Sequence, residues 1–169
     1  MADMREIIID KVTVNIGVGA PGDKLEQAKS LLSRLTEGRK PIETAARRRD
    51  PVFKLRKGLP IGAKITLRGT SAKTFLDKAL IAKRKLLKES NFDKQGNFAF
   101  GVHEYIDFPG AKYDPAIAMF GFDVCVSLGR RGRRVSLRKL RYSSIGKRHR
   151  ITKDEAMDFA RKTLSVRLE

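Results

Sequence analysis

Apolar and polar residues alternate along several stretches of the chain, with the period of a strand that has one buried face. Between residues 11 and 16 the apolar positions are Val12, Val14 and Ile16. The positions between them are Lys11, Thr13 and Asn15. Residues 61–68 repeat this pattern, with an apolar side and a cationic side. Residues 97–108 and 120–128 are predicted as two further strands.

Three other stretches carry apolar residues at helical spacing. The first begins with Asp23 as the expected cap and ends before Gly38. The second covers about residues 71–89. The third opens at Thr152, with Glu155 three residues later, which is the sequence form of a capping box.

The order of these elements is strand, helix, strand, helix, strand, strand, helix. Strands that alternate in polarity indicate a sheet with one exposed face. We therefore predict a single α+β domain over residues 1–169, with a mainly antiparallel sheet and helices packed on one face. Its N-terminal half, 1–62, contains a glycine turn and a projecting basic loop, and its C-terminal half, 63–169, contains a basic segment.

Positive charge is abundant and unevenly distributed. The chain has 37 Lys and Arg against 19 Asp and Glu, a net charge of +18. Residues 39–68 carry a net charge of +8, residues 130–150 carry +10 without any acid, and the remainder is neutral as a set. Concentration of charge predicts two surfaces for a polyanion, and nucleic acid is the expected partner.

A membrane surface is the competing partner, but no basic amphipathic helix carries the excess charge. Asp3 and Glu6 argue against a signal peptide at the N-terminus. The single cysteine, Cys125, excludes an internal disulfide framework and suits a reducing compartment. We expect a cytoplasmic protein.

The basic segment 130–150 contains eight arginines and two lysines. Arginine suits bidentate phosphate contacts and stacking on bases. Because glycines interrupt the charges, we expect this segment to have no packed form of its own and to become ordered on RNA.

A search for enzyme chemistry yields one candidate motif. Two histidines, His103 and His149, and one cysteine cannot form a zinc site, so neither a metal nor a cofactor is expected. Residues 17–22 match G-x-G-x-x-G, which would suit a dinucleotide-binding or RNA-modifying enzyme. The preceding strand has a polar face, however, and no acidic residue ends a second apolar strand about 20 residues later. The glycines are better interpreted as a tight turn or a close backbone approach.

Five ordered motifs resemble the L-five family of large-subunit ribosomal proteins. They are VNIGVG at 14–19, GRKP at 38–41, FKLRKGLPIG at 53–62, KITLRG at 64–69 and NFAFGVHE at 97–104, with further matches at 108–109 and 113–114. The C-terminal stretches 145–147 and 149–156 resemble the archaeal and eukaryotic branch. The resemblance covers nearly the whole chain.

The resemblance implies a non-enzymatic protein of the central protuberance that binds 5S rRNA, contacts P-site tRNA and touches the small-subunit head protein thirteen. It also implies 23S-type rRNA and other central-protuberance proteins as partners, and no homo-oligomer. The resemblance and the predicted exposed sheet face together nominate the following residues as contacts to 5S rRNA: Lys11, Thr13, Asn15, Gly17, Arg39, Lys40, Pro41, Lys64, Thr66 and Arg68.

The loop between Ala46 and Phe53 corresponds to a family loop that reaches the P-site tRNA, which nominates Arg47, Arg48 and Arg49. Lys54 and Arg56, which follow this loop, are expected to contact tRNA as well. For the C-terminal basic segment we expect other rRNA contacts from Arg130, Arg131, Arg133, Arg134, Arg138, Lys139, Arg141, Lys147, Arg148 and Arg150. Two residues depart from the family pattern: Arg39 stands where many members have Gln, and His103 replaces a common Arg.

Overall fold

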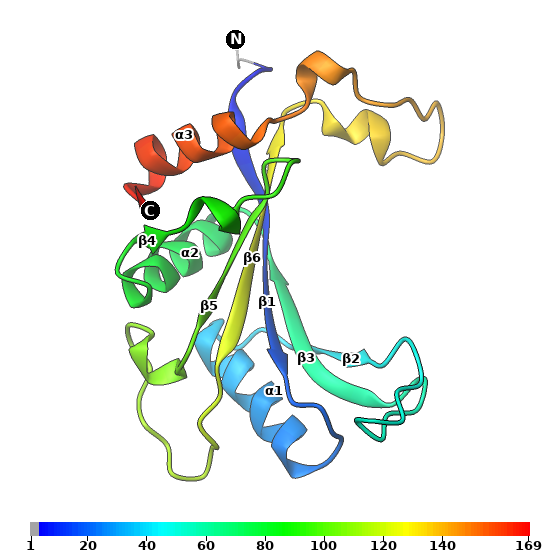
Figure 1. The fold of residues 1–169 in the computed structure, drawn as a ribbon, viewed down its shortest axis with the longest axis vertical. Coiled ribbons are helices and arrows are strands. Elements are labelled where there is room, and N and C mark those ends of the chain that lie inside the picture. Colours follow the sequence, from blue (N-terminus) through cyan, green and yellow to red (C-terminus); the bar gives the residue numbers. More distant parts are fainter. Residues whose placement is uncertain (1–3) are drawn as a thin grey trace. The chain divides into compact units, whose positions relative to one another are not determined.

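The computed structural model describes residues 4–169 (Figure 1). Asp3, used above against a signal peptide, lies outside the described residues. A five-stranded sheet has the order β2-β3-β1-β6-β5. Its strands are β1 (Ile7–Gly17), β2 (Ile42–Ala45), β3 (Pro60–Leu67), β5 (Phe98–Val102) and β6 (Phe122–Arg130). The helices are α1 (Asp23–Leu35), α2 (Thr70–Ala82) and α3 (Lys153–Leu164).

Shorter elements complete the fold. Strands β4 (Leu86–Leu87) and β7 (Arg167–Leu168) form a small parallel pair. Single 3-10 turns cover Glu89–Asn91, Tyr105–Asp107, Arg133–Ser136 and Lys147–His149. The prediction of an α+β fold with a mainly antiparallel sheet is confirmed.

The chain forms two compact units, each built from segments that are distant in the sequence. The first unit contains residues up to Val12, Arg68–Phe100 and Cys125–Glu169. The second unit contains Thr13–Leu67 and Gly101–Val124. The prediction of a single domain over 1–169 stays a prediction.

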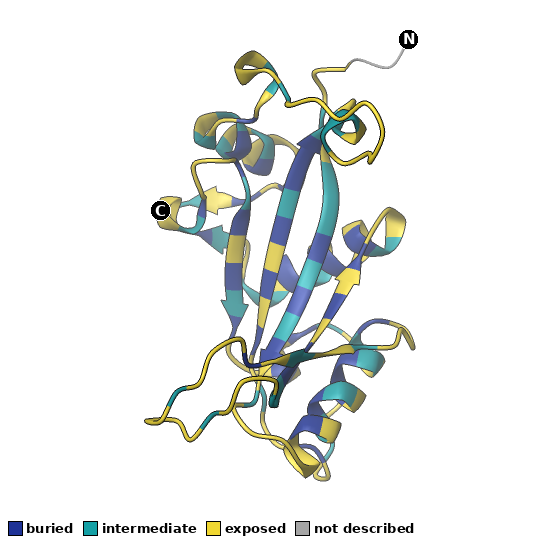
Figure 2. Ribbon diagram, turned by 90° about the vertical axis from the view of Figure 1, so that its right-hand side faces the viewer, coloured by how far each residue is buried: buried dark blue, intermediate teal, exposed yellow. Residues whose placement is uncertain are grey.

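In the second unit, α1 packs against β3 through its apolar side. Val14 and Ile16 of β1 and Ile65 of β3 are buried, whereas the residues between them are not, so burial alternates along both strands (Figure 2). The strands approach closely at Gly62, where an added Cβ would lie 2.6 Å from the Ile16 carbonyl oxygen. The alternation predicted from the sequence is therefore confirmed for both strands.

In the first unit, α2 buries one face, formed by Ala72, Phe75, Leu76, Ala79 and Leu80. Helix α3 begins with the predicted capping box: Glu155 N donates to Thr152 Oγ1, and Thr152 N donates to the Glu155 carboxylate. These bonds satisfy amides that the first helical turn would otherwise leave unpaired.

Helix α2 is shorter than predicted, because it ends at Ala82 and not near Glu89. Arg84 and Lys85 have φ values of 55°, in the left-handed region, so the chain turns there. Leu86 and Leu87, which follow, pair with β7. Tertiary pairing of these leucines overrides their helical spacing.

Other boundaries also differ from the sequence prediction. Gly22 and not Asp23 is the cap of α1, and no side chain caps this helix. Strand β5 ends at Val102 because a 3-10 turn follows, in which the buried Tyr105 donates its N–H to the Phe120 carbonyl at 3.0 Å. Strand β2 was not predicted; it is an edge strand whose Ile42 is 65% exposed, so it lacks the alternation that reveals a half-buried strand.

Candidate RNA-binding surfaces

The second unit presents a polar sheet face on its two neighbouring strands β1 and β3. We call this the open face and define it by Thr13, Asn15, Lys64 and Thr66. Lys64 and Thr66 are exposed, and Thr13 and Asn15 are half-buried. Within residues 4–169, none of these four side chains forms a hydrogen bond or ion pair. Their polar groups are therefore available to an external partner.

Two further predicted 5S contacts lie in the first unit. Lys11 of β1 is half-buried. Arg68 follows β3, and its Nη1 lies 3.1 Å from Asp10 Oδ1 while its side chain is 63% exposed. An exposed ion pair of this kind contributes little to stability, so Arg68 can exchange its partner for a phosphate at small cost.

The glycine turn does not have the structure of a dinucleotide site. The N–H groups of Val18 and Gly19 both donate to the Ile61 carbonyl, at 2.9 and 2.8 Å, so they cannot cradle a phosphate. In a dinucleotide-binding βαβ unit, the strand after the helix would lie beside β1. Strand β2, which follows α1, pairs with β3 instead and is not adjacent to β1. Gly19 and Gly22 have φ values of 83° and 117°, which confirms the interpretation as a tight turn.

The remaining nominated 5S contacts of the second unit are accessible. Gly17, Arg39 and Lys40 are exposed and Pro41 is half-buried. A Cβ added at Gly17 would meet no atom of residues 4–169 within 4 Å. The backbone at Gly17 is therefore open to a close partner.

Residues 46–58 form a loop that is closed at its base. Gly58 N donates to the Ala46 carbonyl at 2.9 Å, and Asp50 and Leu55 exchange two backbone hydrogen bonds further out. Asp50 Oδ1 also accepts from Val52 N at 3.0 Å, so this carboxylate stabilises the turn that Asp50-Pro51 predicts. All five nominated tRNA contacts are exposed: Arg47, Arg48, Arg49, Lys54 and Arg56.

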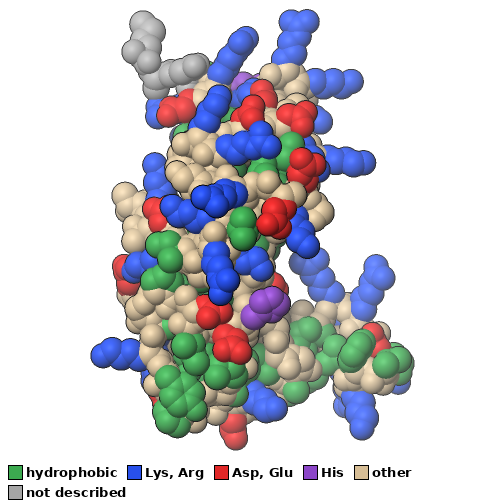
Figure 3. Space-filling view, turned by 60° about the vertical axis from the view of Figure 1, so that its left-hand side comes forward, with side chains coloured by type: hydrophobic (Ala, Val, Ile, Leu, Met, Phe, Trp, Pro, Cys, Tyr) green, Lys and Arg blue, Asp and Glu red, His purple; other side chains and the backbone are tan. Residues whose placement is uncertain are grey.

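The tip of this loop carries two apolar residues that the sequence analysis did not nominate. Val52 is 84% exposed and Phe53 is 72% exposed. Figure 3 shows hydrophobic side chains among Lys and Arg side chains at the end of the loop. Exposed aromatic rings among cations are typical of single-stranded RNA contacts. The interleaving of Phe53 with Arg and Lys was the signal available in the sequence.

Both acids of the basic segment 39–68 have partners inside the protein. Asp50 stabilises the loop turn, and Glu43 Oε1 lies 2.9 Å from Lys29 Nζ. Lys29 also pairs with Glu26 at 2.6 Å, and hydrogen bonds to these two glutamates raise the pKa of Lys29. The charge of Glu43 is therefore offset by Lys29, while Asp50 acts as the acceptor that shapes the loop turn.

The C-terminal basic segment 130–150 is attached to the body of the first unit at several points. Arg130 Nη2 donates to Glu155 Oε1 at 2.7 Å, and its side chain is only 9% exposed. Arg133 lies 3.3 Å from Asp10, and Arg131 lies 3.5 Å from Glu6. The expectation that this segment has no packed form is therefore wrong for these three arginines, because each finds a carboxylate elsewhere in the unit.

The rest of the segment projects from these attachments. Its remaining nominated residues are all exposed: Arg134, Arg138, Lys139, Arg141, Lys147, Arg148 and Arg150. Arg138 Nε donates to the Arg141 carbonyl at 2.8 Å, which holds a local turn. The exposed part of the segment therefore presents seven cations.

Glu155 connects this segment to helix α3. Its pKa is lowered chiefly by the hydrogen bond from the Thr152 backbone N–H, and further by Arg130. A comparable pair in the second unit joins Arg34 Nη1 and Asp114 Oδ2 at 2.6 Å, and Arg34 is the main cause of the lowered pKa of Asp114. The carboxylates of Glu155 and Asp114 therefore each pair with an arginine of the same unit.

The described residues offer no cluster of His, Cys, Asp or Glu that could hold a metal ion. In the same part of the chain, no helix is long and apolar enough to cross a membrane.

Comparison with protein families gives two adjoining matches. The model of ribosomal protein L5 matches residues 3–56, and the model of the C-terminus of the same ribosomal family matches residues 60–167. The boundary between the two matches falls at the end of the basic loop.

Archaeal relatives align over almost the full length. The large ribosomal subunit protein uL5 of Pyrobaculum aerophilum is 48% identical over 166 residues, which cover 98% of this chain and 92% of the relative. Proteins of the same name from Methanococcus maripaludis and Sulfolobus acidocaldarius are 49% and 47% identical, over 92% and 96% of this chain and 87% and 91% of theirs. The chain belongs to the ribosomal protein L5 family and is a structural, non-enzymatic component of the ribosome.

Proposed function

We propose that this protein, as a constituent of the large ribosomal subunit, binds 5S rRNA in the central protuberance through the open face and the residues around it. The observation that carries this proposal is the alternation on β1 and β3, which buries Val14 and Ile65 and leaves polar and cationic side chains on the other side. Threonine and asparagine supply hydrogen bonds that depend on RNA shape, while Lys64 neutralises phosphate.

The nominated set extends beyond the open face. Gly17 offers open backbone, and Arg39, Lys40 and Pro41 follow α1 on the same unit. In the first unit, Lys11 and Arg68 add two cations. We propose that the neutral groups fix the register on 5S rRNA and that the cations supply most of the affinity.

We further propose that the basic loop contacts P-site tRNA. Arg47, Arg48, Arg49, Lys54 and Arg56 are exposed, and none of them has a carboxylate partner among residues 4–169. A narrow loop with free cations suits contacts along a nucleic acid backbone. A bridge to the small-subunit head protein thirteen and contacts with neighbouring central-protuberance proteins belong to the same proposal, without assigned residues.

The exposed cations of segment 130–150 are proposed to bind the large-subunit rRNA of the 23S type. Arg130, Arg131 and Arg133 were nominated with them, but each has an internal carboxylate partner. We propose that these three arginines chiefly hold the segment in place and that Arg134, Arg138, Lys139, Arg141, Lys147, Arg148 and Arg150 meet the RNA.

Filter binding of 5S rRNA by the full chain across a salt series tests the central proposal. We expect tighter binding to 5S rRNA than to an unrelated RNA of equal length at every salt concentration. Affinity for both RNAs should fall as salt rises, because cations on the protein release counterions from phosphate. Equal affinity for the two RNAs would contradict the proposal.

A further inference from the structure

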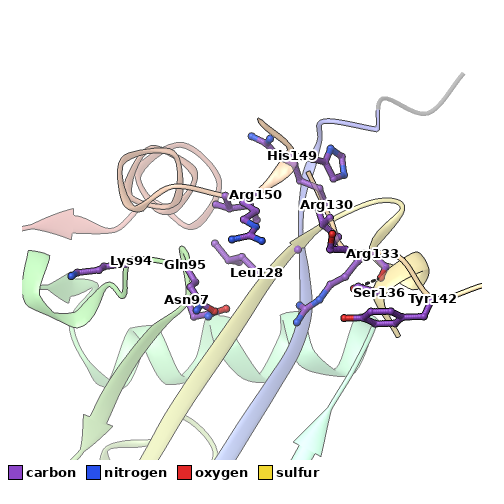
Figure 4. A pocket seen from close by; sticks show the side chains of 14 residues that line it. Lys94, Gln95, Asn97, Leu128, Arg130, Arg133, Ser136, Tyr142, His149 and Arg150 are labelled. Carbon is purple, nitrogen blue, oxygen red and sulfur yellow. Dashed lines mark hydrogen bonds between the residues drawn. The ribbon is translucent and has the colours of Figure 1, made fainter. Parts of the chain in front are cut away.

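The first unit contains an open pocket beside the basic segment 130–150. It lies between the end of β6, the turn at residues 94–97 and the basic segment 130–150, and its volume is about 510 Å³ (Figure 4). This volume lies within the range of roughly 300–1,000 Å³ that small-molecule sites occupy. Every lining residue belongs to the first unit.

The pocket is cationic and contains no carboxylate among its lining residues. Arg130 and Arg133 lie in its wall and are held by Glu155 and Asp10. Lys94 and Arg150 also line it, and neither forms an ion pair within residues 4–169. Two cations are thus fixed in place and two are free to meet an anion.

One donor in the wall lacks an acceptor. Among residues 4–169, the buried Arg130 Nε has no hydrogen-bond partner, although Nη2 of the same guanidinium is bonded to Glu155. A buried donor without a partner is unfavourable, and here it adds to the positive character of the pocket wall. This arrangement favours an anionic ligand over a neutral apolar one, because the site keeps an excess of positive donors.

The remaining lining suits a nucleobase. Leu128 and Ile151 are buried and give the pocket apolar surface, and Tyr142 adds an aromatic ring that is 67% exposed. Gln95 and Asn97 face Arg150 and Leu128, while Tyr142 lies on the other side beside Ser136 (Figure 4). Apolar surface, an aromatic ring and amide groups together bind the face and the edges of an unstacked base.

We infer that this pocket binds a single unpaired nucleotide of RNA, with its base against Tyr142 and its phosphate against Arg150. The inference rests on the proposed function, in which segment 130–150 meets rRNA, and it specifies what the segment recognises there. A nucleotide held within a duplex cannot enter, because its base is stacked and paired. The segment therefore distinguishes bulged from regular RNA.

The probe is a short RNA hairpin that carries one bulged 2-aminopurine, compared with a hairpin in which the 2-aminopurine is paired with uracil in a regular stem. Fluorescence titration with the full chain at fixed salt measures both affinities. We expect wild-type protein to bind the bulged hairpin about tenfold more tightly, which is the range expected for stacking one base on an aromatic side chain. The 2-aminopurine emission should change on binding, because its stacking partner changes.

Variants separate the pocket from general charge. Tyr142→Ala and Arg150→Gln should each remove most of the preference for the bulge, whereas Tyr142→Phe should retain it because the ring is kept. Lys139→Gln removes an exposed charge of the same segment that does not line the pocket, so it should weaken both hairpins equally.

Three results would overturn the inference: equal affinity of wild-type protein for both hairpins, a preference that survives in Tyr142→Ala with Arg150→Gln, or a loss of preference in Lys139→Gln. Circular dichroism confirms that each variant is folded. The 5S filter-binding assay is scored separately. A chain that selects 5S rRNA but ignores the bulge refutes the pocket alone, and a chain that selects the bulge but not 5S rRNA refutes the proposed function alone.

Discussion

Arg130 donates a hydrogen bond to Glu155 at 2.7 Å, and Glu155 also closes the capping box at the start of α3. One carboxylate therefore secures the first residue of the basic segment and the first turn of the helix that follows it. Because the Arg130 side chain is only 9% exposed, it has little access to water if this partner is lost. The stability of α3 and the placement of the RNA-binding segment are coupled through this pair.

Replacement of Glu155 should destabilise the protein more than replacement of the neighbouring acidic residue in the first turn of α3. Glu155→Gln loses the charged partner of Arg130 and weakens the acceptor of the capping box, so we expect a loss of about 2 kcal/mol in the free energy of unfolding. Urea denaturation measures it. Asp154→Asn is the matched control, since Asp154 is exposed in the same helical turn. An equal loss in both variants would contradict the special role of Glu155.

The same pair makes stability depend on pH in the acid range. Because its pKa in the folded state lies below the ordinary value of 4.5, Glu155 contributes stability that is fully present above 4.5. This contribution is lost as the pH falls through the folded-state pKa. The difference in unfolding free energy between wild type and Glu155→Gln should therefore shrink between about pH 6 and about pH 3.

Asp114 titrates in the same direction through its pairing with Arg34, but it is present in both proteins, so the difference isolates Glu155. Parallel denaturation curves at several pH values provide the measurement. A difference that stays constant down to about pH 3 would show that Glu155 acts without its charge.

Local patterns in the sequence predict much of this fold. The alternation at residues 11–16 and 61–68 correctly predicts β1 and β3, and Thr152 with Glu155 correctly predicts the start of α3. Each of these signals is contained within a few neighbouring residues. Strand β2 has no such signal, because an edge strand with an exposed Ile42 shows no burial pattern.

The attachments of the basic segment could not be predicted in the same way. Arg133 meets Asp10, which is 123 residues away, and Arg130 meets Glu155, which is 25 residues away. Charge counting treats every arginine of the segment alike, whereas the fold pairs some of them with distant carboxylates. The pocket could not be predicted for the same reason, since its walls come from separate parts of the chain.

Substitution of Gly62 and of Gly17 distinguishes a glycine that the fold requires from a glycine that is proposed to contact RNA. A Cβ at Gly62 would lie 2.6 Å from the Ile16 carbonyl oxygen and 2.9 Å from Thr44 Oγ1. Gly62→Ala should therefore lower the unfolding free energy by about 1–3 kcal/mol, because a strand must shift. Thermal denaturation measures the effect.

Gly17→Ala is the counterpart, because no atom in the described part of the chain lies within 4 Å of the added methyl group. We expect its stability to change by less than about 0.5 kcal/mol. Its affinity for 5S rRNA should nevertheless fall if the RNA backbone approaches Gly17 closely. Unchanged 5S affinity in Gly17→Ala would remove this residue from the proposed interface.

The open face and the basic loop are predicted to have separate roles. The double variant Asn15→Ala, Thr66→Ala should weaken 5S rRNA binding while leaving its salt dependence almost unchanged, since neutral groups release no counterions. Replacement of Arg47, Arg48 and Arg49 with Gln should leave 5S binding nearly intact and weaken binding of tRNA to ribosomes that carry the variant. Filter binding across salt and tRNA binding to purified ribosomes measure the two effects.

Lys112→Gln is a suitable control for the loss of charge, because Lys112 is exposed in the second unit and belongs to neither surface. It should change 5S affinity only slightly and leave tRNA binding unaffected. If the arginine variant lost as much 5S affinity as Asn15→Ala, Thr66→Ala, the loop would be part of the 5S interface. The separation rests on a physical distinction, because the loop offers mainly charge to a passing backbone whereas the open face offers fixed hydrogen-bonding groups to one RNA shape.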